Sequence, residues 1–153
     1  MKFDKFAVVA EARKWLGTPF RHQGRSREHG VDCIGLIMQV AVDMGLVSIS
    51  ELEFKRMSRY KTIPDIDRLI AGLNRYMIEV PDVQVGDVAH ISWGPGADYH
   101  VGFVSRVEEH VHVIHACADP GRVIESAVPE DKDWMRIISY YRFKEVNSWL
   151  QHY

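Results

Sequence analysis

The chain has 153 residues, of which 46% are hydrophobic and 26% are charged. These proportions are typical of a globular protein, and the length fits a single domain, 1–153, that buries a core. The formal net charge is −2, and the basic residues are scattered apart from Arg21, Arg25 and Arg27. A nucleic acid is therefore not an expected partner, because a polyanion needs a basic surface.

The N-terminal residues lack the apolar core and small-residue cleavage site of a secretion signal, and no later segment reaches membrane-spanning length. We therefore expect synthesis in the cytoplasm without a signal peptide, and no membrane span. The two cysteines, Cys33 and Cys117, are too few for a disulfide framework. Both thiols are expected to be reduced.

The first half of the chain carries helical periodicity. Residues 6–16 place apolar side chains on one helical face, and Gly17 is the expected end of this helix. A second helix is predicted over about 32–44. Segment 51–60 is charged and only weakly periodic, so a helix and a loop both remain open. Segment 65–76 follows a proline and has one apolar face, which predicts a further helix.

The second half of the chain changes to β-type patterns. Short apolar runs are separated by Gly, Pro, Asp and charged turns. The predicted strands are Val83–Trp93, Tyr99–Val107, Val111–Cys117, Val123–Ser126 and Met135–Phe143. Helices followed by strands, without alternation, predict an α+β fold in which N-terminal helices pack on a curved antiparallel sheet of about five to six strands.

Cys33 stands where a loop becomes a predicted helix, directly after the candidate N-cap Asp32. A free thiol with a pKa of ~8.5 is mostly protonated at neutral pH, and the first turn of a helix favours the thiolate. Cys33 is therefore a candidate nucleophile. From position alone, a cysteine buried as a small hydrophobic residue remains an equally open interpretation.

Two histidines on predicted strands could serve this thiol. Strand alternation places His100 and Gly102 on one face, and the missing side chain at Gly102 leaves room for a close approach. His115 shares a face with Val113, so it is expected to point inward. A Cys–His pair also needs a third group that holds the imidazole, and His115 is the candidate. Surface exposure or local hydrogen bonding is the expectation for His22, His29, His90, His110, His112 and His152.

A zinc site is the alternative use of these side chains. Cys33, His100, His115 and Cys117 are plausible ligands, but only the last two form a close pair in sequence, whereas structural zinc usually takes closely spaced ligand pairs. The chain also lacks a phosphate-binding glycine loop, a Gly-x-Ser-x-Gly elbow and a His-Glu-x-x-His motif. We therefore expect no metal and no cofactor.

Several sequence blocks in order resemble the NlpC family of bacterial and phage cell-wall cysteine peptidases. They are Gly17-Thr18-Pro19-Phe20, Asp32-Cys33-Ile34-Gly35-Leu36, Gly86-Asp87-Val88, His100-Val101-Gly102-Phe103-Val104 and Ile114-His115-Ala116. Further blocks resemble the branch found in phage tails and gene-transfer agents. These are His22-Gln23-Gly24-Arg25, Gly30-Val31-Asp32-Cys33, Arg122-Val123-Ile124-Glu125-Ser126 and Tyr141-Arg142-Phe143.

The resemblance implies a reduced papain-like fold and a peptidase that cuts peptidoglycan stem peptides, typically between γ-D-glutamyl and a diamino acid. It implies Cys33 as the nucleophile, His100 as the general base and then acid, and His115 as the residue that orients His100. Asp32 is a candidate substrate ligand besides its role as a helix cap, and Gln23 is a candidate second oxyanion donor. Phage-tail proteins would be the partners, with the protein associated with a virion tail.

The chain departs from the family pattern at two positions. The family commonly has Tyr at Phe20 and Ser at Ile34, and the missing hydroxyls bear on substrate specificity at a site to which Phe20 is expected to contribute. Two alternatives therefore stay open. One is a structural tail component with little turnover, and the other is an amidase or acyltransferase that acts on another substrate with the same Cys–His–His set.

Overall fold

The computed structural model describes residues 4–48, 50, 66–129 and 134–144. The described helices are α1 (Lys5–Arg13), α2 (Cys33–Asp43) and α4 (Ile66–Tyr76). The segment 51–60, for which helix and loop were both open, lies outside the described residues. The three helices agree with the sequence expectations to within a few residues at each end.

Capping side chains explain where the first two helices begin. Asp4 precedes α1, and its Oδ1 accepts hydrogen bonds from the backbone N–H groups of Phe6 (3.0 Å) and Ala7 (3.2 Å). Asp32 precedes α2, and its Oδ1 accepts from the Gly35 N–H at 2.8 Å. Helix α2 is buried on most of its circumference, which explains why its sequence is apolar with little amphipathic contrast.

The main sheet has six antiparallel strands in the order β3-β8-β4-β5-β6-β7. Its strands are β3 (Met77–Val80), β4 (Val88–Ser92), β5 (His100–Val107), β6 (Val111–Cys117), β7 (Arg122–Val128) and β8 (Arg136–Phe143). A separate small sheet pairs β1 (Arg25–Ser26) with β2 (Gly30–Val31). The α+β class and the sheet of about five to six strands are confirmed.

Sequence patterns missed three strands and lengthened another. Strands β1 and β2 have two residues each, too few for alternation to be visible, and β3 directly follows α4. The strand expected from Val83 begins only at Val88. Gly86 adopts a φ of 90° at the preceding turn, and a Cβ there would lie 2.9 Å from the Lys5 carbonyl oxygen. A residue with a side chain is strained at this turn, so the extended backbone cannot start earlier.

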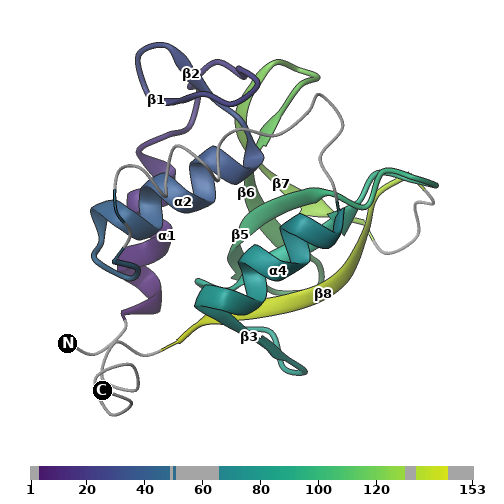
Figure 1. Ribbon diagram of the computed structural model, residues 1–153. Coiled ribbons are helices and arrows are strands. Elements are labelled where there is room, and N and C mark those ends of the chain that lie inside the picture. The colour runs from purple at the N-terminus through teal and green to yellow at the C-terminus, as the bar shows by residue number, and fades with distance from the viewer. Residues whose placement is uncertain (1–3, 49, 51–65, 130–133, 145–153) are drawn as a thin grey trace.

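The helices cover one face of the curved sheet. Figure 1 shows α1 and α2 side by side on this face, with the strands passing behind them and α4 lying beside β3. Alternation along β5 divides its side chains between two apolar clusters. Phe103 packs under the helices, whereas Val104 belongs to the cluster on the opposite face of the sheet. Strand β5 therefore lies in the middle of the molecule, and its first residue is His100.

Candidate active site

Cys33 is the first residue of α2, as the sequence predicts, and its thiol lies against the start of β5. The sulfur is 3.9 Å from the carbonyl oxygen of Tyr99, and it accepts a hydrogen bond from the backbone N–H of Val101. These residues flank His100 on both sides. Cys33 is 9% exposed, so the tertiary structure places a nearly buried thiol beside the backbone that carries His100.

Burial, more than the helix terminus, sets the protonation of this thiol. Burial, and after it the neighbouring Asp32 carboxylate, raise the pKa of Cys33 to about 12, against the smaller effects of N–H donors from Val101 and Ile34. The expectation that the first helical turn favours the thiolate therefore does not hold for the free protein. At neutral pH Cys33 is a neutral thiol, because desolvation of the sulfur outweighs the helix dipole.

His100 and His115 face each other across β5 and β6. His100 Nε2 and His115 Nδ1 share a hydrogen bond of 2.7 Å, and the rings meet edge to face with centroids 5.0 Å apart. His115 Nε2 in turn lies 2.8 Å from Ser126 Oγ on β7. Adjacent strands thus each contribute one member of a continuous hydrogen-bonded row, His100 to His115 to Ser126.

Gly102 makes the close approach of the two histidines possible. A Cβ at this position would lie 3.0 Å from His115 Cβ, 3.1 Å from the Ile114 carbonyl oxygen and 3.3 Å from Val113 Cβ. The sequence predicts that the missing side chain leaves space for another group. The structure shows that this group is His115, whose Cβ packs directly over the glycine.

Both imidazoles are neutral at physiological pH. Burial lowers the pKa of His100 well below its usual range, and His115 lowers it further. Burial also lowers the pKa of His115 to about 4. In the hydrogen bond between the two rings, one nitrogen carries the proton and the other accepts it. When His100 donates it from Nε2, His100 Nδ1 is left as a base, and His115 must donate its own proton from Nε2 to Ser126.

Sequence reasoning gave no role to two neighbours of the histidine pair. The Trp93 ring lies 4.9 Å from the His100 ring and 6.0 Å from the His115 ring, centroid to centroid, and is nearly parallel to the latter. Trp93 is in turn stacked on Trp134 at 6.1 Å. Ser126 appears in the sequence only within a closing block, and no local signal marks it as the partner of a histidine eleven residues earlier.

Asp32 uses both carboxylate oxygens to organise the loop before the nucleophile. Its Oδ1 caps α2 at Gly35, and its Oδ2 accepts a 2.7 Å hydrogen bond from the backbone N–H of Gln23. Gln23 adopts a φ of 60°, which is uncommon for a residue other than glycine. The backbone N–H of Gln23 therefore ties the loop to the start of α2.

Phe20 lies on the same loop connection and packs against the apolar core under the helices. Its backbone N–H donates to the Gly121 carbonyl oxygen at 2.8 Å, and it forms a bridge with Val31. The structure thus gives Phe20, Gln23 and Asp32 structural contacts. Their contributions to substrate binding stay predictions.

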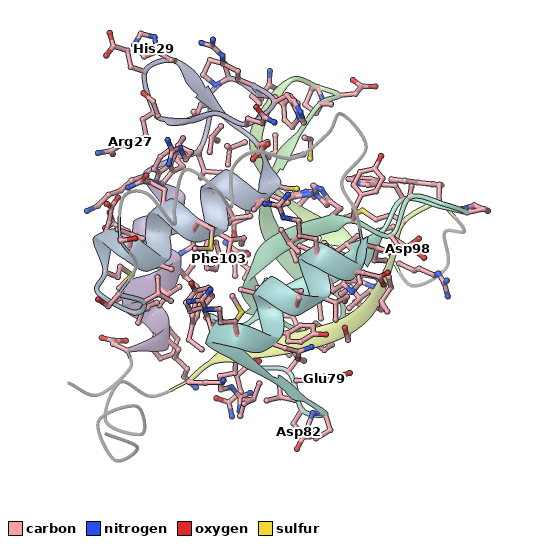
Figure 2. All side chains as sticks on the ribbon, viewed as in Figure 1. Arg27, His29, Glu79, Asp82, Asp98 and Phe103 are labelled. Atoms are coloured by element: carbon pink, nitrogen blue, oxygen red, sulfur yellow. The ribbon has the colours of Figure 1, made fainter. Side chains whose placement is uncertain are left out.

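Side chains around the candidate site divide into buried ones, which point into the protein, and exposed ones, which point into solvent. Figure 2 shows Phe103 pointing into the layer between the sheet and the helices, in agreement with its complete burial. In the same view Arg27 and His29 project outward from the β1–β2 hairpin. Exposure of His29 agrees with the surface position expected from the sequence, whereas His90 is buried and bonds the Asp98 carbonyl oxygen through Nε2. The expectation of a local hydrogen bond for His90 is confirmed.

Cys117 is the second buried cysteine, and it is free, as is Cys33. Its sulfur lies 3.3 Å from His115 Nδ1, the nitrogen that also meets His100. Burial raises the pKa of the Cys117 thiol to about 12, so it too is a neutral thiol at pH 7. Cys117 therefore contacts the residue that orients His100.

No protein-family profile matches the chain, and no curated protein matches it. Several solved structures, by contrast, are similar to it. The NlpC/p60 domain of the peptidoglycan hydrolase SagA is 24% identical with a TM-score of 0.60, and the match covers 92% of this chain and 100% of that domain. An N-acetylmuramoyl-L-alanine amidase from Bacteroides uniformis is 16% identical with a TM-score of 0.62, over 90% of this chain and 97% of the amidase.

A further match is a Staphylococcus aureus protein of the NLP/P60 family that is similar to a lipoprotein. It is 20% identical with a TM-score of 0.61, and the match covers 94% of this chain and 43% of that protein. These likenesses show that the chain has the papain-like fold of NlpC/p60 domains. In this fold the described residues bring a helix-borne thiol and a strand-borne histidine pair to one place.

Proposed function

We propose that the protein is a cysteine peptidase that hydrolyses an amide bond in peptidoglycan stem peptides. The observation that carries the proposal is the row His100–His115–Ser126 beside the Cys33 thiol. A neutral base oriented by a second neutral histidine is what proton abstraction from a buried thiol requires. A solved structure of the same fold, the NlpC/p60 domain of the peptidoglycan hydrolase SagA, supports the substrate class.

The protonation states favour a base-assisted attack. Cys33 begins as a thiol and His100 as a neutral imidazole. As the sulfur attacks the amide carbonyl carbon, the thiol proton passes to His100 Nδ1. His115 accepts the hydrogen bond from His100 Nε2–H and stabilises the imidazolium that forms. His100 then protonates the leaving amine, which gives a thioester on Cys33, and water hydrolyses the thioester with His100 as the base.

The start of α2 supplies the oxyanion donor in this proposal. Backbone N–H groups in the first turn of a helix have no acceptor within the helix, so the Cys33 N–H is placed where negative charge develops on the carbonyl oxygen. Gln23 is the proposed second donor, because Asp32 holds its backbone next to the start of the helix. Loss of one such donor typically slows turnover by about 100-fold to 1,000-fold.

The proposed bond joins γ-D-glutamyl to a diamino acid, as the sequence resemblance implies. One protein of similar structure is an N-acetylmuramoyl-L-alanine amidase. The amide that links the glycan to the stem peptide is therefore the main competing bond. The experiment is digestion of purified sacculi and defined stem peptides, with products identified by mass spectrometry. Cleavage at the γ-D-glutamyl bond supports the proposal, whereas release of whole stem peptides from the glycan assigns the amidase.

Matched variants separate catalysis from folding. Cys33→Ala and His115→Ala should lose detectable turnover, because they remove the nucleophile and the partner of His100. His112→Ala should keep it, since His112 lies on the same strand but outside the row, with its Nδ1 at 3.2 Å from the His110 carbonyl oxygen. Wild-type activity in the Cys33→Ala variant would overturn the proposal, and inactivity of the wild-type protein on every peptidoglycan substrate would support a structural role.

A second candidate is an amidase or acyltransferase that takes an apolar acyl group. An apolar pocket lies between α2 and α4, and its lining includes Ile34, next to the nucleophile, and Val101, next to His100. Acyl esters and amides of increasing chain length test this candidate. A rate that rises with chain length and disappears in Cys33→Ala favours it over the stem-peptide substrate.

We also propose association with a phage tail, supported by the sequence blocks that resemble the tail branch. Among the described residues, no helix is long and apolar enough to cross a membrane. Expression of a tagged chain during assembly, followed by isolation of tails, tests the proposal. Recovery of the chain with purified tails is the expected outcome, and its recovery only in the free fraction would contradict it.

A further inference from the structure

A cluster of soft donor atoms lies on the far side of His100 from the acyl-transfer chemistry. His100, His115 and Cys117 each offer one donor atom, and these atoms lie within 4.8 Å of one another. All of these side chains are buried, with exposures of 4%, 1% and 3%. Acyl transfer by Cys33 gives Cys117 no role, so the position of its sulfur calls for another explanation.

The donor types select the class of metal. Two imidazole nitrogens and one sulfur suit zinc and similar transition-metal ions, whereas calcium and magnesium prefer oxygen ligands. Three protein ligands leave a fourth tetrahedral position for water. The wide separation of these residues in sequence argued against zinc, but adjacent strands β5 and β6 remove that separation.

Two of the three distances between ligand atoms are close to those of a tetrahedral site, and the third lies within 4.8 Å. With Zn–N of about 2.0–2.1 Å and Zn–S of about 2.3 Å, neighbouring ligand atoms lie roughly 3.3 Å apart for two nitrogens and roughly 3.6 Å apart for nitrogen and sulfur. Cys117 Sγ is already 3.3 Å from His115 Nδ1, and His100 Nε2 is 2.7 Å from it. The nitrogen atoms need to separate by only about half an ångström.

A hydrogen bond that would hold one ligand of such a site in place is already present, between His115 and Ser126. Metal-bound histidines usually donate their other N–H to an oxygen, which fixes the tautomer. His115 Nε2 lies 2.8 Å from Ser126 Oγ, so Nδ1 is the nitrogen that faces His100 and Cys117. The same contact that orients His115 for catalysis thus also orients it as a ligand.

We propose that His100, His115 and Cys117 form an inhibitory Zn²⁺ site. Zn²⁺ takes the place of the proton between His100 Nε2 and His115 Nδ1, the neutral His100 ring then carries its proton on Nδ1, and Cys117 binds as the thiolate after it releases its proton to solvent. His100 then loses the hydrogen bond that stabilises its protonated form. Zinc binding and acyl transfer are therefore mutually exclusive. Binding itself does not depend on which substrate the protein cleaves.

Calorimetric titration of the EDTA-treated full-length protein with ZnCl₂ tests the site. One equivalent should bind, and Cys117→Ser should weaken binding by more than about 100-fold, because even loss of an outer-shell partner costs 10-fold to 100-fold. Cys33→Ala and His112→Ala should bind zinc as the wild type does, since neither residue belongs to the cluster. Titration with Co²⁺ should give a thiolate-to-metal charge-transfer band in Cys33→Ala and none in Cys117→Ser.

Urea unfolding of Cys117→Ser and Cys117→Ala checks that both variants fold, and weakened zinc binding in both excludes an effect of the serine itself. Binding that survives in both Cys117 variants, binding that is lost in Cys33→Ala, or no binding at all by the wild type would each overturn the proposal. If the protein hydrolyses a substrate, zinc should inhibit it and EDTA should restore it. If it hydrolyses none, the binding results still decide the metal site.

Discussion

Asp32 shows how one side chain has opposing effects on the candidate site. Its two carboxylate oxygens cap α2 and hold the backbone of Gln23, so it builds the start of the helix and the loop beside it. Its charge also raises the pKa of the adjacent Cys33 thiol. The residue that positions the proposed nucleophile therefore disfavours ionisation of the thiol, and in the proposed mechanism a base accepts the proton during attack.

The first prediction concerns the thiol. Because burial holds the pKa of Cys33 at about 12, the thiolate is a very small fraction at pH 7, and alkylation by iodoacetamide should be slow. The rate should rise about tenfold per pH unit between pH 7 and pH 9, without a plateau. Mass spectrometry of the Cys33 peptide separates this signal from Cys117. A rate that is already constant from pH 6 to pH 9 would reveal a preformed thiolate.

The second prediction is a matched change at Asp32. Asp32→Asn keeps a residue that caps helices well, but it removes the charge and leaves one oxygen to accept from two N–H donors. Folding should become less stable by about 1–3 kcal/mol, while alkylation of Cys33 at pH 8 should become faster because the pKa of the thiol falls. Urea unfolding and alkylation rates measure the two effects. Slower alkylation of a folded variant would contradict this interpretation of the charge.

At the scale of elements, the contact of β5 with β6 determines the geometry of the histidine pair. Gly102 has no side chain, and His115 occupies the space above it. The antiparallel register pairs Phe103 with Ile114, so His115 lies across from Gly102 and both histidines lie on the same side of this pair. A small local change in this strand pair should therefore affect the site more than it affects the sheet as a whole.

Gly102→Ala tests this dependence. The added methyl would crowd His115 Cβ and the backbone of β6, so the His100–His115 hydrogen bond should break, with a stability loss of about 1–3 kcal/mol. Turnover should fall by about 100-fold or more, since a positioned general base typically contributes about 100-fold to 10,000-fold. Val104→Ala, a buried change further along β5 that does not crowd His115, controls for destabilisation alone. Equal loss of turnover in the two variants would refute a specific role for Gly102.

At the scale of the whole molecule, two ion pairs join distant parts of the chain. Arg142 of β8 binds both carboxylate oxygens of Asp87, at 2.9 and 3.0 Å, in the turn before β4. Arg13 of α1 binds Glu125 of β7 at 3.1 Å through each of two nitrogens. The pairs differ in burial, since the Asp87 side chain is 1% exposed and the Arg13 side chain is 42% exposed.

The more buried of the two ion pairs should contribute more to the free energy of unfolding. Asp87→Ala leaves Arg142 without its main partner and the Gln84 N–H without its acceptor, so the free energy of unfolding should fall by about 3 kcal/mol. Arg13→Ala should cost less than about 1 kcal/mol, because solvent screens the exposed pair. Urea unfolding of the two variants measures both values. A larger loss for Arg13→Ala would show that the connection of α1 to β7 is the stronger constraint.

Much of the architecture could be predicted because its signals are local. Asp32 as a cap, the apolar spacing of 32–44 and the alternation around His100 and His115 each involve residues near in sequence, and the structure has α2, β5 and β6 there. The same patterns could not reveal β1 and β2, which are too short to alternate, or the partner of each strand in the sheet. Pairing depends on contacts between residues far apart in the chain.

The sequence by itself determined the helices and the longer strands of this protein and which side chains stand at their starts and on their faces, because hydrogen bonding to neighbours and side-chain periodicity act within a few residues. Only the tertiary structure decided the environment of those side chains. The pKa of Cys33 rises and that of His115 falls because distant segments exclude water from both. The contacts of His115 with His100 and Ser126 likewise depend on strand packing, which gives the proposed acyl-transfer site and the proposed zinc site the same histidines.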